Sequence, residues 1–142
     1  MRLYFAYGSN MWNAQMQRRC PQSRKVGKAW LKGYRWFIAA RGYASVAPSP
    51  NEEVEGVLFE ISPSDEAALD GFEGVAVGSY IKAELPVICG GRHDVSLVYI
   101  DSSKAEGAPV EEYIARINAG VRDAELSPAY VDRYIRRFVP EQ

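Results

Sequence analysis

The chain has 142 residues, of which 47% are hydrophobic and 25% are charged, and its formal net charge is −1 at pH 7. This length and composition fit one globular domain over residues 1–142, with a single sizeable core. The near-neutral charge gives no electrostatic footprint for nucleic acid, so we expect small molecules or proteins as partners.

Neither a secretion signal nor a membrane span is recognisable in the sequence. Arg2 is followed by an apolar run of only five residues, too short for a signal peptide, and no stretch approaches the roughly 18 apolar residues of a span. Cys20 and Cys89 are far apart, which argues against a disulfide framework. We therefore expect a cytoplasmic protein that does not bind membranes.

The first predicted strand, residues 2–7, ends abruptly at Gly8-Ser9-Asn10. A corner of three small turn-forming residues leaves several backbone N–H groups without a partner in a sheet. Either water or a ligand must take these amides. The following residues 13–19 predict a short helix.

Three further strands are predicted in the next segment. Residues 29–40 and 44–48 are rich in aromatic and β-branched side chains, which favours two strands around a loop at residues 41–42. Residues 54–61 place hydrophobic side chains at every second position, as a strand with one buried face does.

A short helix should follow, because Ser62-Pro63 combines an N-cap residue with a proline at the first helical position. Asp65 lies at the capping-box position, and Gly71 marks the expected end of the helix. Residues 80–87 and 95–100 then predict a hairpin. In the first of these strands apolar side chains alternate with more polar ones. The apolar set is Ile81, Ala83, Leu85 and Val87, and the other set is Tyr80, Lys82 and Glu84.

Two helices are expected at the end of the chain, opened by Pro109 and by Ser127-Pro128. The apolar positions that follow helical spacing are Val110, Tyr113, Ile114, Ile117 and Val121 in the first helix, and Val131, Tyr134, Ile135 and Phe138 in the second. Strands dominate the first two thirds of the chain and helices the last third. This order predicts an α+β fold with a largely antiparallel sheet.

The inventory of reactive side chains is small, with one histidine and two cysteines. No zinc spacing and no glycine-rich phosphate loop occurs, so we expect no metal and no cofactor. His93 lies in GGRHD and is expected to be a solvated turn residue. A nucleophilic pair formed by Cys89 with a histidine stays open. Any other chemistry must use carboxylates, hydroxyls, phenols and backbone groups.

One carboxylate stands out, in LDGFEGVAVGSY at residues 69–80. Glu73 is flanked by Phe72, Val75 and Val77, and such neighbours can desolvate a carboxyl group and raise its pKa. A carboxyl group with a pKa near neutral is suited to general acid–base catalysis. The alternative is a solvent-exposed turn glutamate.

The segments YFAYGSN, EGVLFEIS, LDGFEGVAVGSY and GAPVEEYIARINAG together resemble the γ-glutamylcyclotransferase family over nearly the whole chain. The resemblance implies a small mixed, largely antiparallel β-barrel surrounded by α-helices, with a pocket at one barrel mouth. It also implies that the Y-G-S-N loop holds a γ-glutamyl head group and that the glutamate of E-G-V is the catalytic acid and base. The matching positions are Glu73 as the catalytic residue and Tyr7, Gly8, Ser9, Asn10, Met11, Tyr80 and Tyr113 as substrate-binding residues.

The implied reaction is the cyclisation of a γ-glutamyl compound to 5-oxoproline with release of an amine or amino acid, without metal or cofactor. The Y-G-S-N sequence is most similar to the branch that acts on γ-glutamyl amino acids, and loops such as residues 41–53 would select the leaving group. Three alternatives stay open. In the first, the same fold is a non-catalytic binding or interaction module. In the second, the protein is a hydrolase with Cys89 as its nucleophile. In the third, which concerns one residue, Tyr113 packs in the apolar stripe of its helix and does not bind substrate.

Overall fold

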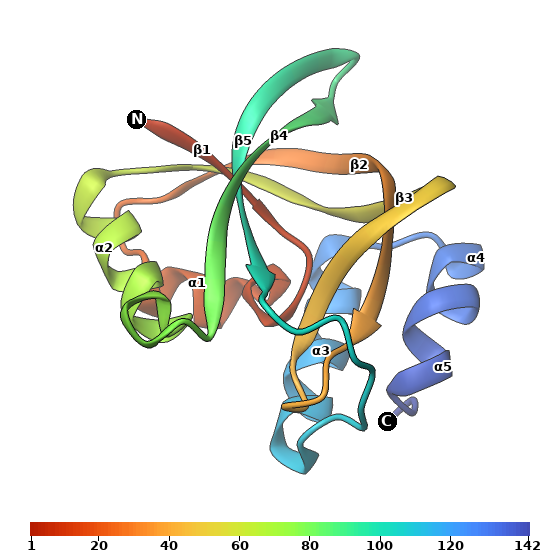
Figure 1. Ribbon diagram of the computed structural model, residues 1–142. Coiled ribbons are helices and arrows are strands. Elements are labelled where there is room, and N and C mark those ends of the chain that lie inside the picture. Colours follow the sequence, from red (N-terminus) through yellow and green to blue (C-terminus); the bar gives the residue numbers. More distant parts are fainter.

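Five strands close into a barrel in the computed structural model, which describes residues 1–142 (Figure 1). The strands are β1 (Arg2–Ala6), β2 (Arg24–Ile38), β3 (Ala44–Ile61), β4 (Tyr80–Cys89) and β5 (Arg92–Asp101). Their order around the barrel is β1-β3-β2-β4-β5, and all neighbours are antiparallel except β1 and β5. The expected mixed, largely antiparallel barrel is confirmed.

The sequence was wrong about one break, because residues 44–48 and 54–61 belong to the single strand β3. The prolines and polar residues between them do not end the strand. Asn51 takes a left-handed backbone conformation with φ +68°, and the pairing with β2 shifts register between Lys32 and Tyr34. This irregularity accommodates the extra residues while the ladder continues on both sides. The connection after β2 is therefore shorter than the predicted loop at residues 41–53.

Strand β4 keeps the expected alternation from Ala83 to Val87 and departs from it only at its start. Tyr80 is 6% exposed, whereas Ile81 is 52% exposed. The Tyr80 hydroxyl donates a hydrogen bond to the Ala44 carbonyl (2.7 Å), which satisfies its polar atom inside the barrel end. The predicted hairpin itself is present, and His93 is exposed near its turn, opposite Ile88.

Helices cover the lower end and the sides of the barrel in Figure 1. They are α1 (Asn13–Arg19), α2 (Pro63–Phe72), α3 (Glu111–Ala124), α4 (Pro128–Tyr130) and α5 (Arg136–Phe138), with 3-10 turns at Ser9–Met11 and Val75–Val77. The capping box of α2 forms as expected between Ser62 and Asp65. The second predicted C-terminal helix contains a π-helical segment, Val131–Ile135, between α4 and α5.

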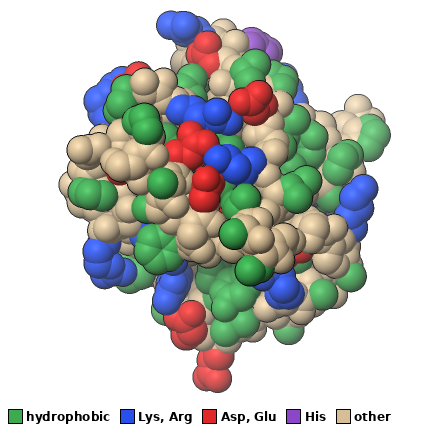
Figure 2. Space-filling view, turned by 60° about the vertical axis from the view of Figure 1, so that its left-hand side comes forward, with side chains coloured by type: hydrophobic (Ala, Val, Ile, Leu, Met, Phe, Trp, Pro, Cys, Tyr) green, Lys and Arg blue, Asp and Glu red, His purple; other side chains and the backbone are tan.

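The core fills the barrel and continues beneath the helices. Its largest fully buried side chains are Trp36, Phe5, Phe37, Met11, Met16, Leu31, Ile38, Leu58, Ile61, Leu69, Leu97 and Ile117. Outside the barrel, acidic and basic side chains gather on the face shown in Figure 2. Lys82 of β4 pairs with Glu66 and Asp70 of α2. These ion pairs attach α2 to the barrel wall. None of the helices is both long enough and apolar enough to cross a membrane.

Candidate active site

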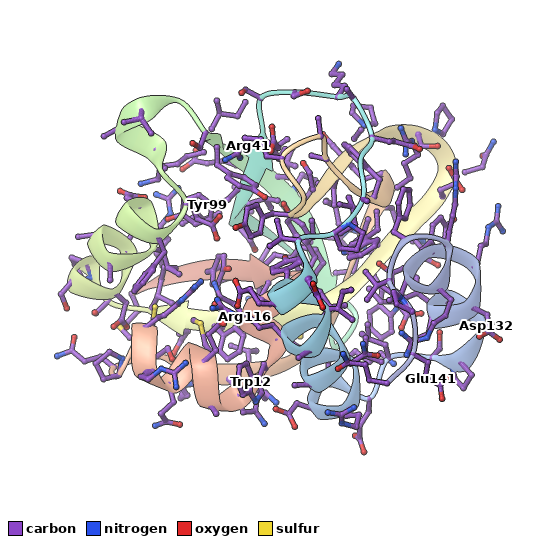
Figure 3. All side chains as sticks on the ribbon, turned by 90° about the horizontal axis from the view of Figure 1, so that it is seen from below. Trp12, Arg41, Tyr99, Arg116, Asp132 and Glu141 are labelled. Atoms are coloured by element: carbon purple, nitrogen blue, oxygen red, sulfur yellow. The ribbon has the colours of Figure 1, made fainter.

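A cavity of about 280 Å³ opens at the barrel end where β1 and β5 finish and β3 and β4 begin. Its lining residues are Tyr4, Phe5, Tyr7, Gly8, Ser9, Asn10, Arg19, Arg41, Tyr43, Ala44, Phe72, Glu73, Gly74, Ser79, Tyr80, Tyr99, Glu112, Tyr113 and Arg116. Figure 3 views the molecule from this side and shows Arg41, Tyr99 and Arg116 on three separate elements around the centre. The wall thus combines phenols, guanidinium groups and carboxylates.

The loop after β1 forms one side of this cavity. The Met11 N–H donates to the Gly8 carbonyl (3.1 Å), so the amides of Ser9 and Asn10 precede the first hydrogen bond of the turn and have no partner within it. Gly8 is required for a close approach, because a Cβ atom there would lie 2.9 Å from Tyr113 Oη. The corner noted in the sequence therefore presents backbone close to the cavity.

A side-chain network holds this loop in shape. Asn10 Nδ2 donates to Tyr4 Oη (2.9 Å), while Gln15 Nε2 donates to both Ser9 Oγ (2.7 Å) and Asn10 Oδ1 (2.9 Å). Arg19 Nη1 also donates to Asn10 Oδ1 (3.2 Å). Both the nitrogen and the oxygen of the Asn10 side-chain amide thus bind other side chains, which fixes its orientation.

Glu73 follows α2 directly, and its N–H donates to the Leu69 carbonyl (2.8 Å) to close the last turn. Gly74 then reverses the chain with φ +63°. The Glu73 side chain is half-buried and makes no hydrogen bond or ion pair with the protein. Burial raises the pKa of Glu73 from its usual 4.5 to about 7, although the positive charges of Arg19 and Arg41 act to lower it. This carboxyl group can both accept and donate a proton near neutral pH.

Three of the expected tyrosines surround the cavity with their hydroxyl groups bound to backbone. Tyr7 donates to the Tyr99 carbonyl and Tyr80 to the Ala44 carbonyl, whereas Tyr113 Oη accepts from the Ala44 N–H (3.3 Å). Burial raises the pKa of Tyr113 to about 12, so its phenol stays protonated at neutral pH. The backbone N–H and the hydroxyl group of Ser9 also interact with the Tyr113 hydroxyl group, which holds this phenol against the loop after β1.

The structure brings most of the expected site residues to one place. Those that line the cavity are Tyr7, Gly8, Ser9, Asn10, Glu73, Tyr80 and Tyr113. Met11 does not line it and is fully buried. The turn carries the Met11 side chain into the core near Gly120 of α3, where an added Cβ would lie 3.1 Å from Met11 Cβ. The Met11 side chain therefore does not reach the cavity, and a role for Met11 in substrate binding stays a prediction.

Sequence reasoning missed the guanidinium groups of the cavity, which come from three elements. Arg19 ends α1, Arg41 lies between β2 and β3, and Arg116 lies on α3. Only one signal was available for Arg19. A helix that directly follows the Gly8-Ser9-Asn10 corner places its polar face toward that corner, and Gln15 and Arg19 are separated by four residues.

Cys89 and His93 lie on the hairpin of β4 and β5, outside the cavity lining. Burial raises the pKa of the Cys89 thiol, which disfavours the reactive thiolate. No hydrogen bond joins these two side chains, and no group of three or more His, Cys, Asp or Glu side chains is arranged to hold a metal ion. The cavity contains no cysteine nucleophile.

Comparison with known proteins points to one family. Residues 4–115 match the family described as gamma-glutamyl cyclotransferase, AIG2-like. The chain is 36% identical over 143 residues to YkqA of Bacillus subtilis, covering 95% of this chain and 51% of that protein, so it spans about half the length of this relative. It is 28% identical over 145 residues to γ-glutamylcyclotransferase of Mus musculus, covering 92% of this chain and 76% of the mouse protein.

Solved structures show the same fold. A structure named gamma-glutamyl cyclotransferase superposes with a TM-score of 0.86 at 24% identity, covering 99% of this chain and 89% of that one. The crystal structure of YkqA superposes with a TM-score of 0.83 at 33% identity, covering 99% of this chain and 56% of that one. The chain belongs to the γ-glutamyl cyclotransferase family.

Proposed function

We propose that this protein cyclises a γ-glutamyl compound to 5-oxoproline and releases the attached amine or amino acid, with Glu73 as general acid and base. The observation that carries the proposal is the state of Glu73. It is a half-buried carboxyl group without any protein partner, its pKa is raised to about 7, and it faces the same cavity as the Gly8 loop. The names of the relatives state the same class of reaction.

The reaction needs a proton acceptor because the α-amino group of the substrate is an ammonium ion at neutral pH and cannot attack. Ionised Glu73 pairs with this ammonium and takes one proton from it. The free amine then attacks the γ-carbonyl carbon of the same molecule, and a new C–N bond closes a five-membered ring. Glu73 returns the proton to the departing nitrogen as the old C–N bond breaks. After the attack the ring nitrogen loses a second proton, which ends on the released amine and makes it an ammonium ion. The ring nitrogen of 5-oxoproline keeps one proton, so the proton count balances.

The loop supports the two remaining requirements of this chemistry. An extended glutamyl chain must curl, and a shaped cavity reduces the entropic part of the barrier. Negative charge develops on the γ-oxygen as the amine attacks, and free donors stabilise it best when they are already in place. The Asn10 N–H has no partner within the turn, and both this amide and the Tyr113 hydroxyl group lie beside the cavity.

The proposal is tested by measuring 5-oxoproline release by mass spectrometry from γ-glutamyl-alanine, glutathione, γ-glutamyl-ε-lysine and a γ-glutamyl amine. We expect wild-type protein to release 5-oxoproline from at least one substrate, and Glu73→Gln to bind that substrate without turnover. The matched control is Glu53→Gln, the same change at an exposed position on β3. Substantial turnover by Glu73→Gln, or no product from wild-type protein with any substrate, contradicts the proposal.

A further inference from the structure

The charged groups around the cavity are unequally paired. Arg41 pairs with Asp101 (2.8 Å) and Arg116 pairs with Glu112 (2.9 Å). Arg19 is the remaining guanidinium of the lining, and no carboxylate oxygen lies within 4.0 Å of its nitrogens. The cavity therefore contains one guanidinium group without a carboxylate in direct contact, although Glu73 lies close enough for the two charges to interact.

Arg19 is held in a fixed orientation even though it lacks an acidic partner. Its Nη1 donates to Asn10 Oδ1 (3.2 Å), and its guanidinium carbon lies 4.2 Å from the centre of the Phe72 ring. Asn10 is itself fixed by Gln15. Only one of the five N–H donors of Arg19 is used within the protein, so the group is positioned but largely free to bind.

A half-buried cation without a carboxylate in direct contact is costly to the folded protein unless a ligand supplies that contact. Glu73 is the corresponding carboxylate without an ion-pair contact. The other carboxylate of the lining, Glu112, is paired with Arg116. One free cation and one free carboxylate in a single cavity match the charges of an α-amino acid head group, which has an α-carboxylate and an α-ammonium on one carbon atom.

We propose that Arg19 binds the α-carboxylate of the γ-glutamyl head group while Glu73 faces its α-ammonium. This assignment rests on the proposed function and deepens it, because it names what the cavity requires of a substrate. A guanidinium group binds a carboxylate through two parallel hydrogen bonds, which fixes the orientation of the head group as well as its position. The Asn10 side chain then serves as a positioning group for Arg19, and the Asn10 backbone amide is left for the γ-oxygen.

The test compares two ligands that differ only at the α-carboxyl group, γ-glutamyl-alanine and its analogue in which that carboxyl group is a primary amide. We expect Arg19→Gln to lower kcat/KM for the carboxylate ligand about 10- to 100-fold, mainly through KM, and to leave the amide ligand within a few fold. Arg19→Lys should keep part of the preference, since it retains the charge without the planar fork. An equal loss for both ligands in Arg19→Gln indicates a merely structural role and overturns the assignment.

A binding measurement separates this inference from the proposed reaction. Calorimetry with both ligands in a Glu73→Gln background needs no turnover, so it decides even if wild-type protein releases no 5-oxoproline. Tighter binding of the carboxylate ligand that disappears on adding Arg19→Gln supports the assignment. Equal binding of the two ligands, or no binding of either, overturns it. Arg18→Gln is the matched control, because Arg18 is the exposed neighbour on α1 and lies outside the cavity lining.

Discussion

Glu73→Gln should stabilise the folded protein at alkaline pH although it removes the proposed catalytic group. Burial raises the pKa of Glu73 from its usual 4.5 to about 7. The folded state therefore binds the proton more tightly than the unfolded chain, and the free energy of unfolding falls as the pH rises through this window. At about 1.4 kcal/mol per pH unit, the full penalty above pH 7 is about 3 kcal/mol. Glutamine has nearly the same shape and carries no charge, so the variant avoids this penalty.

The assay is chemical denaturation of wild-type and Glu73→Gln protein at pH 5 and at pH 8.5. Between these pH values, the stability of the variant relative to wild-type protein should rise by about 2 to 3 kcal/mol. Comparing two pH values cancels the constant effect of placing an amide at this position. Glu53→Gln, at an exposed site, should show no such change. Parallel pH dependences for wild-type and Glu73→Gln protein would refute the reasoning that burial holds the proton on Glu73.

Three further predictions concern the geometry around this group. Because Glu73 must be ionised to take the substrate proton, kcat/KM measured between pH 5 and 9 should fall about tenfold per pH unit below about 7, and a flat profile argues against it as the base. Gly8→Ala places a Cβ 2.9 Å from Tyr113 Oη, so it should reduce kcat/KM and destabilise the protein by about 1 to 3 kcal/mol. Adding Tyr113→Phe removes the hydroxyl group that clashes and should recover part of this stability. Asp70→Ala removes the acceptor of the buried Tyr99 hydroxyl (2.7 Å), so denaturation should show a free energy of unfolding lower by about 1 to 3 kcal/mol. The kcat should also fall, because Asp70 lies on α2, which directly precedes Glu73. Unchanged stability contradicts this prediction.

The elements with strong local signals were predictable from sequence. Ser62 and Asp65 mark the start of α2 through a capping box, which depends on only a few neighbouring residues. The hairpin of β4 and β5 was equally clear from its alternation and its glycine turn. The alternation of β4 alone did not predict the burial of Tyr80, which only the family resemblance placed in the site, because an amphipathic tyrosine fits either side of a strand until a partner such as the Ala44 carbonyl is in place.

Long-range arrangement explains the remaining differences. Strand β3 continues past its prolines only because the neighbouring strand β2 is long enough to pair on both sides of the irregularity. In the site, the raised pKa of Glu73 was expected from its apolar neighbours in sequence, but Phe72 and Val77 are exposed in the structure, so the burial of Glu73 does not come from them alone. The free state of Arg19 was not, because a missing counter-charge depends on where the other carboxylates fold. The burial of the Met11 side chain was not foreseen for a similar reason, since the direction of a side chain within a tight turn is set by packing, here against α3.

The most direct test of the proposed cyclisation is the fate of solvent oxygen during turnover of a γ-glutamyl substrate in ¹⁸O-labelled water. Attack by the substrate's own amine uses no water, so we predict 5-oxoproline that contains no label and a released amine in equal amount. Hydrolysis by water would instead give glutamate with one labelled oxygen in its γ-carboxyl group. Labelled glutamate as the enzyme-dependent product would contradict the account.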